Sequence, residues 1–400
     1  MRTPTLIEKM QKYSAQNYFP LPVVLARGQG AKVWDVDGKE YLDFLACYSA
    51  LNFGHQHPRL LAALKGQAER LAVCSRAFYS EELSLFCEEL ALFCGMEKVL
   101  PMNTGTEAVE TALKLARKWG YEIKKVASDR AKIIVLKNNF HGRTISIVSF
   151  STEPSYRDGF GPYTPGFEVV NFGDVAAIEN AIDENTVAVL IEPIQAESGI
   201  LLPPTGYLSE LRKITRKRKV LLMLDEIQTG LGRTGKDFCF QHEGITPDVL
   251  ILGKSLGGGL LPLSAVVSSA EVMRVIRPGQ HGSTFGGNPL ACAVGRAALD
   301  LMKKEKISER AETLGKIIRD ELMRTPLPKV KEIRGKGALV GIEMAESSGG
   351  ARRYCEKLAT QGVLCKETHD FVIRIAPPLI ISESELRVGL QKIIQVIQAG

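Results

Sequence analysis

The chain has 400 residues, 45% of them hydrophobic and 24% charged, which is an ordinary composition for a globular protein with a large core. Its 51 basic and 45 acidic residues leave a net charge of +6, too small for this length to indicate a nucleic-acid partner. No segment reaches about eighteen apolar residues, and the N-terminus lacks an apolar signal core, so we expect no membrane span and no leader. The length favours roughly two to three domains.

The cysteine pattern favours free thiols. None of the eight cysteines forms a CxxC pair, so the spacing of zinc ribbons and of thioredoxin-like sites is absent from the sequence. A reducing cytoplasm is the simplest location for such a chain. The cysteines are Cys47, Cys74, Cys87, Cys94, Cys239, Cys292, Cys355 and Cys365.

The first predicted elements are a hairpin and a helix. Residues 30–44 alternate apolar and polar side chains around Asp37-Gly38, which is a typical hairpin turn. Further on, helical spacing predicts one amphipathic helix, whose apolar positions are Leu60, Leu61, Leu64, Ala68 and Leu71.

Between Val99 and Ile276, short apolar runs alternate with helical patterns. Alternation of this kind predicts an α/β fold with a mostly parallel sheet covered by helices on both faces. The expected strands lie in residues 132–138, 187–193, 220–226, 248–254 and 263–269.

After Pro289 the pattern changes to a smaller α+β domain, which we expect to pack with the N-terminal hairpin. The predicted domains are therefore an N-terminal segment at 1–50, a large ligand-binding domain at 51–288 and a small domain at 289–400. The small domain is expected to have helices at 289–306, 307–323, 352–361 and from about 382, with strands at 337–344 and 371–375.

Two apolar runs each end in one charged side chain, Asp225 in the first and Lys254 in the second. Because ligands of open α/β sheets bind at the carboxyl ends of the strands, a carboxylate and an amine are both expected in one crevice. Holding both there is costly unless something pairs with them. A pyridoxal 5'-phosphate (PLP) ring would pair with both, through its pyridinium nitrogen and its aldehyde.

Other polar residues follow neighbouring strands. Asn103–Glu107 opens a helix, and its hydroxyls and glycine suit either a phosphate site or a plain helix cap. Phe140 and Arg143 lie in a turn after a strand, where the alternatives are a ligand-facing pair or core packing and a surface ion pair. Glu192 and Glu197 lie near the same sheet edge as Asp225.

Three motifs also suit other interpretations. Gly253-Lys254-Ser255 resembles the end of a phosphate-binding loop, but that motif needs a glycine where position 248 is Asp. Asp225 with Gln228 three residues on also suits a helix cap. His55 and His57 have the composition of a metal clamp without suitably spaced acidic or cysteine companions.

Taken together, these motifs resemble the class III PLP-dependent ω-aminotransferases over nearly the whole chain. Within that family the ornithine aminotransferase branch is the most similar, through residues 17–23, 47–58, 75–79 and 372–379. At position 141 the chain has His, as other branches do, where some members of the ornithine branch have Trp. The motifs that carry the family resemblance are residues 103–110, 140–144, 192–199, 225–235, 253–259 and 281–289.

The resemblance implies a type I PLP-dependent transferase fold, with a seven-stranded type of large-domain sheet, and a role for each matching residue. Lys254 would form the Schiff base with PLP, and Asp225 would bind the pyridine nitrogen. Gln228 would bind the phenolic oxygen of the ring, and Phe140 would stack on its face.

The phosphate of the cofactor would be shared between two subunits. Gly105 and Thr106 would bind it from one chain of a homodimer. Ser283 and Thr284, in a glycine-rich loop, would reach it from the other chain.

The remaining implied roles concern small-molecule substrates. Tyr18 and Arg143 would hold the α-amino and α-carboxylate groups of ornithine, and Tyr48 would shape the pocket. Arg374 would bind the carboxylate beside a reacting α-amine, and Glu197 would pair with Arg374 when no such carboxylate is present.

The expected activity is transfer of the δ-amino group of ornithine to 2-oxoglutarate. Its products are glutamate and glutamate 5-semialdehyde, which cyclises to pyrroline-5-carboxylate. The alternatives are an acetylornithine aminotransferase or another class III ω-aminotransferase, and a binding protein without activity. Tyr18 and Tyr48 favour a free α-amino group, and Lys254 with Asp225 favours an enzyme.

Overall fold

The centre of the fold is a seven-stranded sheet in a computed structural model that describes residues 2–400. Four neighbouring pairs are parallel, while β10 runs antiparallel to both of its neighbours, so the predicted mostly parallel sheet is confirmed. The strand order is β4 (Lys98–Met102), β10 (Ser264–Ser268), β9 (Val249–Leu252), β8 (Leu221–Asp225), β7 (Thr186–Ile191), β5 (Lys132–Leu136) and β6 (Phe167–Val170).

Helices cover both faces of this sheet. Successive residues of a strand point to opposite faces, so each strand contributes side chains to two cores. Ile133 and Val135 of β5 join a core that includes α5 (Gly105–Trp119), while Ile134 and Leu136 join a second core that includes α9 (Tyr207–Arg218). Every residue of β7 and β8 is buried, as expected of central parallel strands.

The expected alternation of strand and helix fails at two connections, one of which, from β9 to β10, contains only a 3₁₀ turn at Lys254–Gly257. The connection from β8 to β9 contains no α-helix, only a 3₁₀ turn at Cys239–Glu243. The interpretation of Asp225 as a helix cap is therefore wrong in the described chain. Its carboxylate instead accepts the backbone N–H of Ile227 at 3.1 Å, which stabilises a tight turn.

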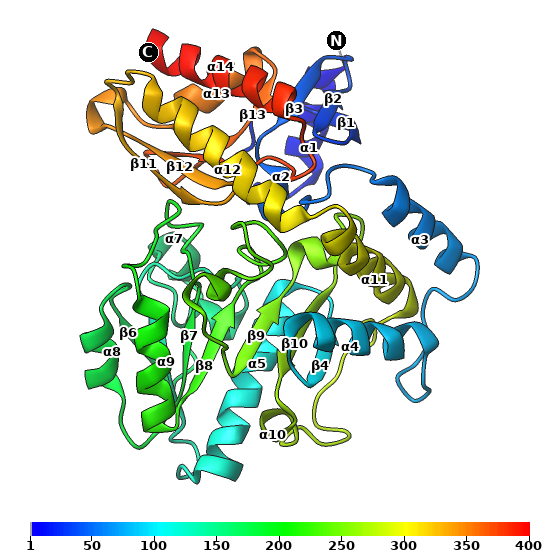
Figure 1. The fold of residues 1–400 in the computed structure, drawn as a ribbon, viewed down its shortest axis with the longest axis vertical. Coiled ribbons are helices and arrows are strands. Elements are labelled where there is room, and N and C mark those ends of the chain that lie inside the picture. Colours follow the sequence, from blue (N-terminus) through cyan, green and yellow to red (C-terminus); the bar gives the residue numbers. More distant parts are fainter. Residues whose placement is uncertain (1) are drawn as a thin grey trace.

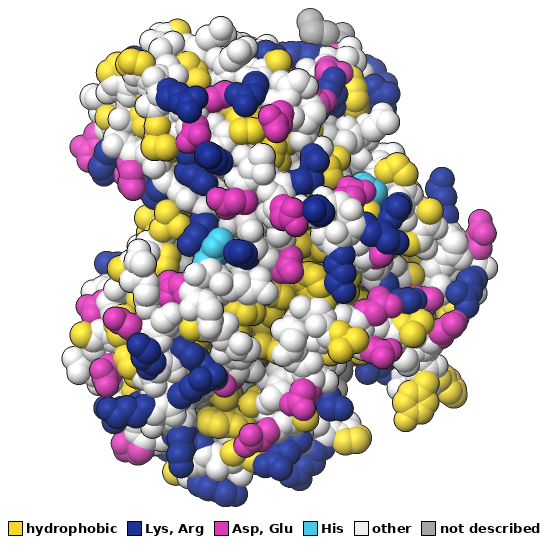
Figure 2. Space-filling view, in the orientation of Figure 1, with side chains coloured by type: hydrophobic (Ala, Val, Ile, Leu, Met, Phe, Trp, Pro, Cys, Tyr) yellow, Lys and Arg dark blue, Asp and Glu magenta, His cyan; other side chains and the backbone are white. Residues whose placement is uncertain are grey.

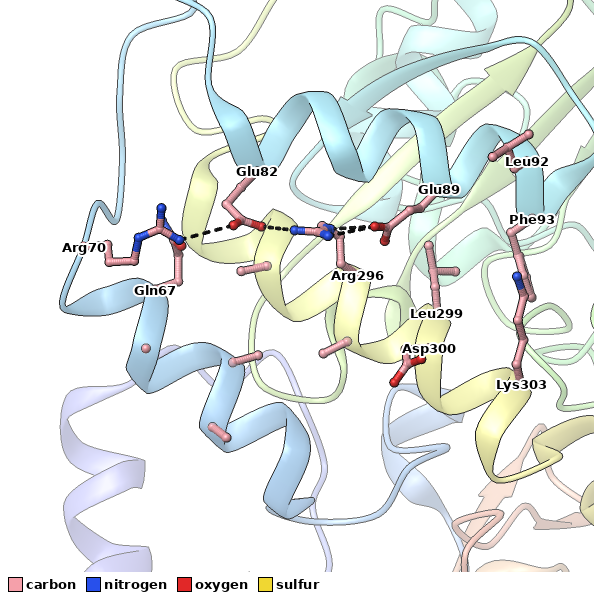
Figure 3. A pocket seen from close by; sticks show the side chains of 15 residues that line it. Gln67, Arg70, Glu82, Glu89, Leu92, Phe93, Arg296, Leu299, Asp300 and Lys303 are labelled. Carbon is pink, nitrogen blue, oxygen red and sulfur yellow. Dashed lines mark hydrogen bonds and ion pairs between the residues drawn. The ribbon is translucent and has the colours of Figure 1, made fainter.

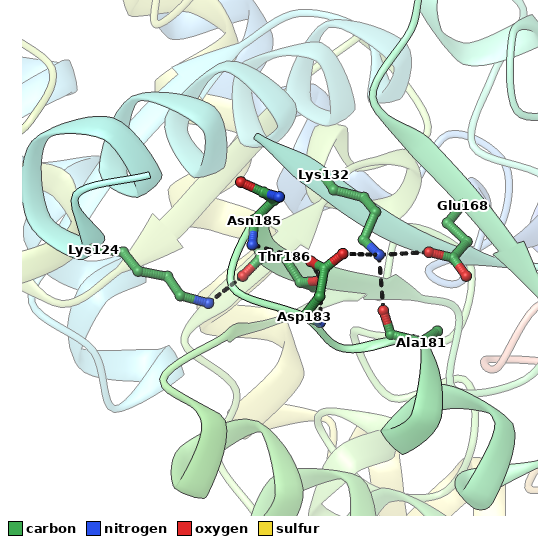
Figure 4. Close-up of polar contacts among 7 residues, drawn as sticks. All are labelled: Lys124, Lys132, Glu168, Ala181, Asp183, Asn185 and Thr186. Carbon is green, nitrogen blue, oxygen red and sulfur yellow. Dashed lines mark hydrogen bonds and ion pairs between the residues drawn. The ribbon is translucent and has the colours of Figure 1, made fainter. Parts of the chain in front are cut away.

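The amino-terminal edge of the sheet is fastened by a lysine network (Figure 4). Nζ of Lys132, the first residue of β5, contacts Glu168 at 2.6 Å, Asp183 at 2.9 Å and the carbonyl of Ala181 at 2.8 Å. Lys124 donates to the carbonyl of Thr186, the first residue of β7. Charged groups at this edge are thus paired with one another, at the opposite end of the strands from Asp225.

The two ends of the chain share the upper lobe in Figure 1. The predicted N-terminal hairpin is confirmed, and it belongs to a sheet in which β3 pairs in parallel with a strand of the C-terminal region. This sheet has the order β1 (Leu25–Gln29), β2 (Lys32–Asp35), β3 (Glu40–Asp43) and β13 (Val363–Leu364).

A second four-stranded sheet of the upper lobe comes entirely from the C-terminal region. The predicted strands near 337–344 and 371–375 are confirmed as its two central strands, and the two edge strands, β11 and β14, are additional. The domain boundaries remain a prediction. The sheet has the order β11 (Val330–Lys336), β12 (Leu339–Met344), β15 (Val372–Ile375) and β14 (Lys366–Thr368).

The predicted C-terminal helices are confirmed within two residues at each end. They are α11 (Pro289–Lys304), α12 (Ile307–Arg324), α13 (Arg352–Thr360) and α14 (Glu383–Ala399). Ser382 caps α14, and its hydroxyl accepts the N–H of Glu385 at 3.2 Å.

The remaining helices lie in the first 273 residues. The predicted helix around Leu60 ends earlier than expected, at Ala68, and Leu71 is exposed beyond it. These helices are α1 (Thr3–Tyr13), α2 (Ala46–Ser49), α3 (Pro58–Ala68), α4 (Glu81–Cys94), α6 (Ile145–Val148), α7 (Pro154–Arg157), α8 (Val175–Ala181) and α10 (Ala270–Met273).

On the face drawn in Figure 2, basic and acidic side chains are interspersed, so the net charge of +6 is not gathered there into one basic field. Among the helices of residues 2–400, none is both long and apolar enough to cross a membrane. All eight cysteines are free.

Candidate active site

A cavity of about 210 Å³ opens at the carboxyl edge of the large sheet. It lies where β5, β7, β8 and β9 end, and it faces the N-terminus of α5. Six residues that the sequence assigned to the cofactor line it. The full lining is Thr104, Gly105, Thr106, Phe140, His141, Gly142, Glu192, Ile194, Asp225, Ile227, Gln228, Thr229 and Lys254.

Lys254 enters this cavity from a strained backbone. It lies two residues after β9, and its backbone φ of +47° is in the left-handed region, which residues other than glycine rarely adopt. Burial lowers the pKa of the Lys254 amine to about 8, although the negative charges of Glu197 and Asp225 oppose that shift. This lowered pKa gives the amine a larger neutral fraction near neutral pH than an ordinary lysine has, which favours its use as a nucleophile and base.

Asp225, the last residue of β8, is oriented from two sides. Its Oδ1 accepts the N–H of Ile227 at 3.1 Å, and its Oδ2 lies 2.7 Å from Nδ1 of His141. The His141 ring is buried, and its Nε2 has no partner among the described residues. With Nδ1 as the donor, His141 fixes the carboxylate that faces the cavity.

The first turn of α5 provides an anion site. Thr104 caps the helix, and its hydroxyl accepts the N–H of Glu107, whose carboxylate in turn accepts the N–H of Asn103 and of Thr104. Gly105 and Thr106 follow at the N-terminus and line the cavity. The helix-cap and phosphate-site interpretations of this segment are therefore compatible, because the helix dipole favours an anion at the same end.

Phe140 is held at the cavity by a buried acid. Its N–H donates to Oε1 of Glu192 at 2.8 Å, and its ring meets Tyr156 edge-on with centroids 5.8 Å apart. Burial, and then the negative charge of Asp225, raises the pKa of Glu192 well above its usual range. Glu192 therefore serves the site mainly by positioning the loop that carries Phe140.

Arg374, which is buried, and Glu197, which is half-buried, form an ion pair beside the cavity. Nη1 of Arg374 lies 3.0 Å from the Glu197 carboxylate and 3.2 Å from the Gln228 side-chain oxygen. Gln228 donates its amide to Glu197 at 3.1 Å, so the three side chains form one network. Burial alone would raise the pKa of Glu197, but the charge and hydrogen bond of Arg374 outweigh it and lower that pKa to about 2.

Tyr48 reaches this pair from a left-handed turn. Ala46, Cys47, Tyr48 and Ser49 all have positive φ, between +46° and +73°, which is costly for residues with a side chain. The Arg374 guanidinium lies 5.0 Å from the centroid of the Tyr48 ring. The strained turn therefore places an aromatic face against the arginine of the site.

Tyr18 and Arg143 meet at the rim. The Arg143 guanidinium lies 4.3 Å from the ring centroid of Tyr156, 5.8 Å from that of Phe140 and 6.0 Å from that of Tyr18. Tyr18 is 70% exposed. The structure thus brings these two predicted residues together, outside the cavity itself.

Ser283 and Thr284 do not line this cavity within the described chain. The Ser283 hydroxyl accepts the Asn103 side-chain amide at 2.9 Å, and Thr284 is exposed. Both residues line a separate hollow of about 660 Å³ with residues 73–76 and Gly282.

A groove of about 670 Å³ lies between α3, α4 and α11, away from these residues (Figure 3). Four of its charged side chains are linked to one another. Arg296 binds Glu89 and Glu82, and Arg70 approaches Glu82 at 3.7 Å. The two histidines considered for a metal are likewise engaged, His55 with Asp43 at 2.8 Å and His57 with Glu305 at 3.1 Å.

The cavity thus combines an amine, an oriented carboxylate, a helix N-terminus and an aromatic ring. These groups match the aldehyde, ring nitrogen, phosphate and ring face of PLP, so the residues present fit that cofactor. Sequence analysis found these residues because each follows a strand or begins a helix. It missed His141 as a partner of Asp225, because that contact joins residues 84 positions apart.

Comparison with known proteins agrees with this geometry. The family model "Aminotransferase class-III" matches residues 13–397. The chain is 51% identical over 397 residues to a protein of Staphylococcus saprophyticus named ornithine aminotransferase 2, covering 99% of this chain and 100% of that one.

Two solved structures share the whole fold. The ornithine aminotransferase of Toxoplasma gondii, described with partial occupancy of PLP at its active site, has a TM-score of 0.98 and 47% identity, covering 99% of this chain and 94% of that one. The acetylornithine aminotransferase of Elizabethkingia anophelis has a TM-score of 0.89 and 45% identity, covering 100% and 99%. The chain belongs to the class III aminotransferases.

Proposed function

We propose that this chain transfers the δ-amino group of L-ornithine to 2-oxoglutarate with PLP as cofactor. The products are L-glutamate and glutamate 5-semialdehyde, which cyclises to pyrroline-5-carboxylate. One observation carries the proposal. The ion pair of buried Arg374 and half-buried Glu197, 3.0 Å apart beside Lys254 and Asp225, provides a cation that its own partner can neutralise. The similarity to ornithine aminotransferases over the full length supports it.

The cofactor-binding residues follow from the chemistry of the cavity. When bound, PLP supplies an electron sink for the bond electrons at the substrate carbon. Lys254 would hold it covalently, Asp225 would bind its ring nitrogen, Gln228 its phenolic oxygen and Phe140 its ring face. Its phosphate would lie at the N-terminus of α5, on Gly105 and Thr106.

Lys254 also moves the proton in this proposal. Its lowered pKa, about 8, leaves a neutral amine available near the operating pH, which is the condition for efficient general-base catalysis. The amine would remove a proton from the substrate carbon and deliver it to the former aldehyde carbon of the cofactor, on the same side of the site. Asp225, oriented by His141, keeps negative charge beside the ring nitrogen throughout.

The substrate-binding residues explain how two unlike substrates use one site. Tyr18 and Arg143 at the rim would hold the α-amino and α-carboxylate groups of ornithine, with Tyr48 shaping the pocket wall. While ornithine reacts through its δ-amine, Glu197 neutralises Arg374. When glutamate reacts, its α-carboxylate would take the place of Glu197 on Arg374.

A homodimer is part of the proposal, because Ser283 and Thr284 stay outside their own cavity and have hydroxyls to offer a phosphate. The exposed Thr284 supports a contact with a second copy. A cytoplasmic location is also proposed, supported by the eight free cysteines. No nucleic acid or membrane is expected as a partner.

The experiment that tests the function compares ornithine with N-acetylornithine at equal concentrations, each with 2-oxoglutarate. Preference for free ornithine, with formation of pyrroline-5-carboxylate, supports the proposal. Preference for the acetylated substrate would instead indicate an acetylornithine aminotransferase, which is the activity named for the Elizabethkingia anophelis protein.

A further inference from the structure

The loop that carries Glu197 is held in an unusual conformation. We call residues 195–201 the Glu197 loop. Its two ends pair with each other, since Gln195 and Leu201 exchange backbone hydrogen bonds of 3.1 and 3.0 Å. Between them, Gly199 has φ of +94° and Ile200 has φ of +57°. A β-branched residue rarely adopts such a backbone, so surrounding contacts must maintain it.

The loop packs against one row of residues in the sheet formed by β11, β12, β15 and β14. Arg334 of β11 faces Gly341 of β12, which faces Arg374 of β15, so the three stand side by side across adjacent strands. Gly341 has no side chain, and a Cβ there would lie 3.3 Å from the Gly199 carbonyl oxygen and 3.4 Å from Cβ of Ile200. The absence of a side chain at Gly341 therefore leaves room for the loop between the two arginines.

Both arginines bind carbonyl groups of the Glu197 loop. Nη2 of Arg374 donates to the carbonyl of Ala196 at 3.1 Å. Arg334 donates from Nε to the carbonyls of Gly199 and Ile200 at 3.0 and 3.2 Å, and from Nη2 to Gly199 at 2.7 Å. We call Arg334 and Arg374 the arginine clamp.

The two halves of the clamp differ in their other partners. Arg334 is 9% exposed and is anchored within its own sheet, by Glu332 at 2.7 Å and by Glu343. Arg374 uses its other terminal nitrogen, Nη1, to bind the carboxylate of Glu197 itself. Arg374 must therefore change partner whenever a substrate carboxylate arrives, whereas nothing in the site requires Arg334 to move.

We propose that Arg334 is a positioning residue for substrate choice, the fixed half of the arginine clamp that keeps the Glu197 loop in place while Arg374 changes partner. The inference rests on the proposed function. Without Arg334, Glu197 loses its fixed position and neutralises Arg374 less well. The ornithine half-reaction should then slow more than the glutamate half-reaction, as we also expect when Glu197 itself is replaced.

The contact is tested by hydrogen exchange of the holoenzyme, followed by mass spectrometry of peptides covering residues 195–201. Arg334→Met should speed exchange at Gln195 and Leu201 by about tenfold or more, the scale of losing one charge-assisted hydrogen bond. Arg310→Met is the matched control, because Arg310 also donates to two small-domain carbonyls, of Leu379 and Ile381, away from this loop. Unchanged exchange rates of these peptides in Arg334→Met would show that Arg334 does not hold the Glu197 loop in place.

The consequence for substrate choice is measured as the ratio of the ornithine to the glutamate single-turnover rate. Arg334→Met should lower this ratio about tenfold, within the range of coupling between contacting residues. In a Glu197→Gln background it should lower the ratio less than about twofold further, because the effect acts through Glu197. Lysine cannot reproduce the two parallel hydrogen bonds of a guanidinium, so the ratio in Arg334→Lys should lie between those of wild type and Arg334→Met. If Arg334→Met does not fold, Arg334→Lys takes its place in the test.

Two results would overturn the role in substrate choice. One is faster exchange without any change of the ratio in either Arg334 variant. The other is an equal fall of the ratio in Arg310→Met, which would show a general loss of stability. If the wild-type enzyme has no ornithine half-reaction at all, the proposed function fails, while the exchange measurement still decides the clamp.

Discussion

Lys254 is the residue on which the proposed chemistry depends, and its pKa of about 8 gives a direct prediction. Attachment of PLP to the cofactor-free protein requires the neutral amine, so its rate should rise with pH and reach half its maximum near pH 8. Borohydride reduction followed by peptide mapping locates and quantifies the label. Lys124 is a control, because burial lowers its pKa as well but it lies at the opposite edge of the sheet. Labelling of Lys124, or a midpoint near 10.5, would contradict the assignment.

His141 gives a second prediction at this scale. Asp225→Ala removes the charge beside the ring nitrogen and should slow the chemical step at least about a hundredfold. His141→Phe only frees the Asp225 carboxylate to turn, so we expect a loss of roughly tenfold, the scale of one buried hydrogen bond. His141→Asn, whose amide can replace the Nδ1 donor, should recover part of that loss. Equal rates in wild type and His141→Phe would remove His141 from the mechanism.

Single residues divide clearly into those that the sequence predicted and those it did not. Asp225 and Lys254 were found because an abrupt charge after an apolar run indicates a strand end. His141 and Arg334 carry no such signal, since each acts through a partner distant in sequence, Asp225 or the carbonyl of Gly199. Only the fold brings these contacts together.

At the scale of elements, the strands that the sequence pattern did not predict lie at the sheet edges. The buried central strands were predicted because their apolar runs are continuous. β4 was not, because it contains Pro101, and proline in an apolar run argues against a central strand. β4 is in fact an edge strand, as are β6 and β11, and β11 is half exposed and largely polar.

The Glu197 loop and β15 together make the prediction about the two substrates. Glu197→Gln keeps the shape of the side chain but removes the charge that neutralises Arg374. We expect the ornithine half-reaction to slow by roughly ten- to a hundredfold, the scale of leaving one buried charge partly unpaired, and the glutamate half-reaction to slow less. Single-turnover rates of each half-reaction separate the two. Equal losses, or a larger loss with glutamate, would show that Glu197 does not select between the substrates.

At the scale of the whole molecule, the association of the chain ends was predictable and the completion of the site was not. The hairpin signal and the switch to α+β patterning indicated that both ends share one lobe, as the pairing of β3 with β13 shows. A single chain leaves Ser283 and Thr284 outside the cavity. Their role at a phosphate rests on the family resemblance rather than on any contact within the chain.

Mixing inactive subunits tests that role. Thr284→Ala protomers keep Lys254, and Lys254→Ala protomers keep Thr284, so a hybrid dimer should have one complete site. Activity should therefore reappear after mixing, and cofactor affinity should fall when the dimer dissociates. Size-exclusion or mass measurements must first show that subunits exchange. Exchange without any recovered activity would count against a shared site.

The transfer of nitrogen from the δ-position of ornithine is the centre of the account, and isotope labelling measures it most directly. The purified protein, loaded with PLP, is given 2-oxoglutarate and ornithine carrying ¹⁵N at either the δ- or the α-position, and the glutamate formed is analysed by mass spectrometry. We predict that the label reaches glutamate from δ-labelled ornithine and not from α-labelled ornithine, and that Lys254→Ala abolishes the transfer from the δ-position. Label arriving from the α-position, or no label from either, would contradict the proposed reaction.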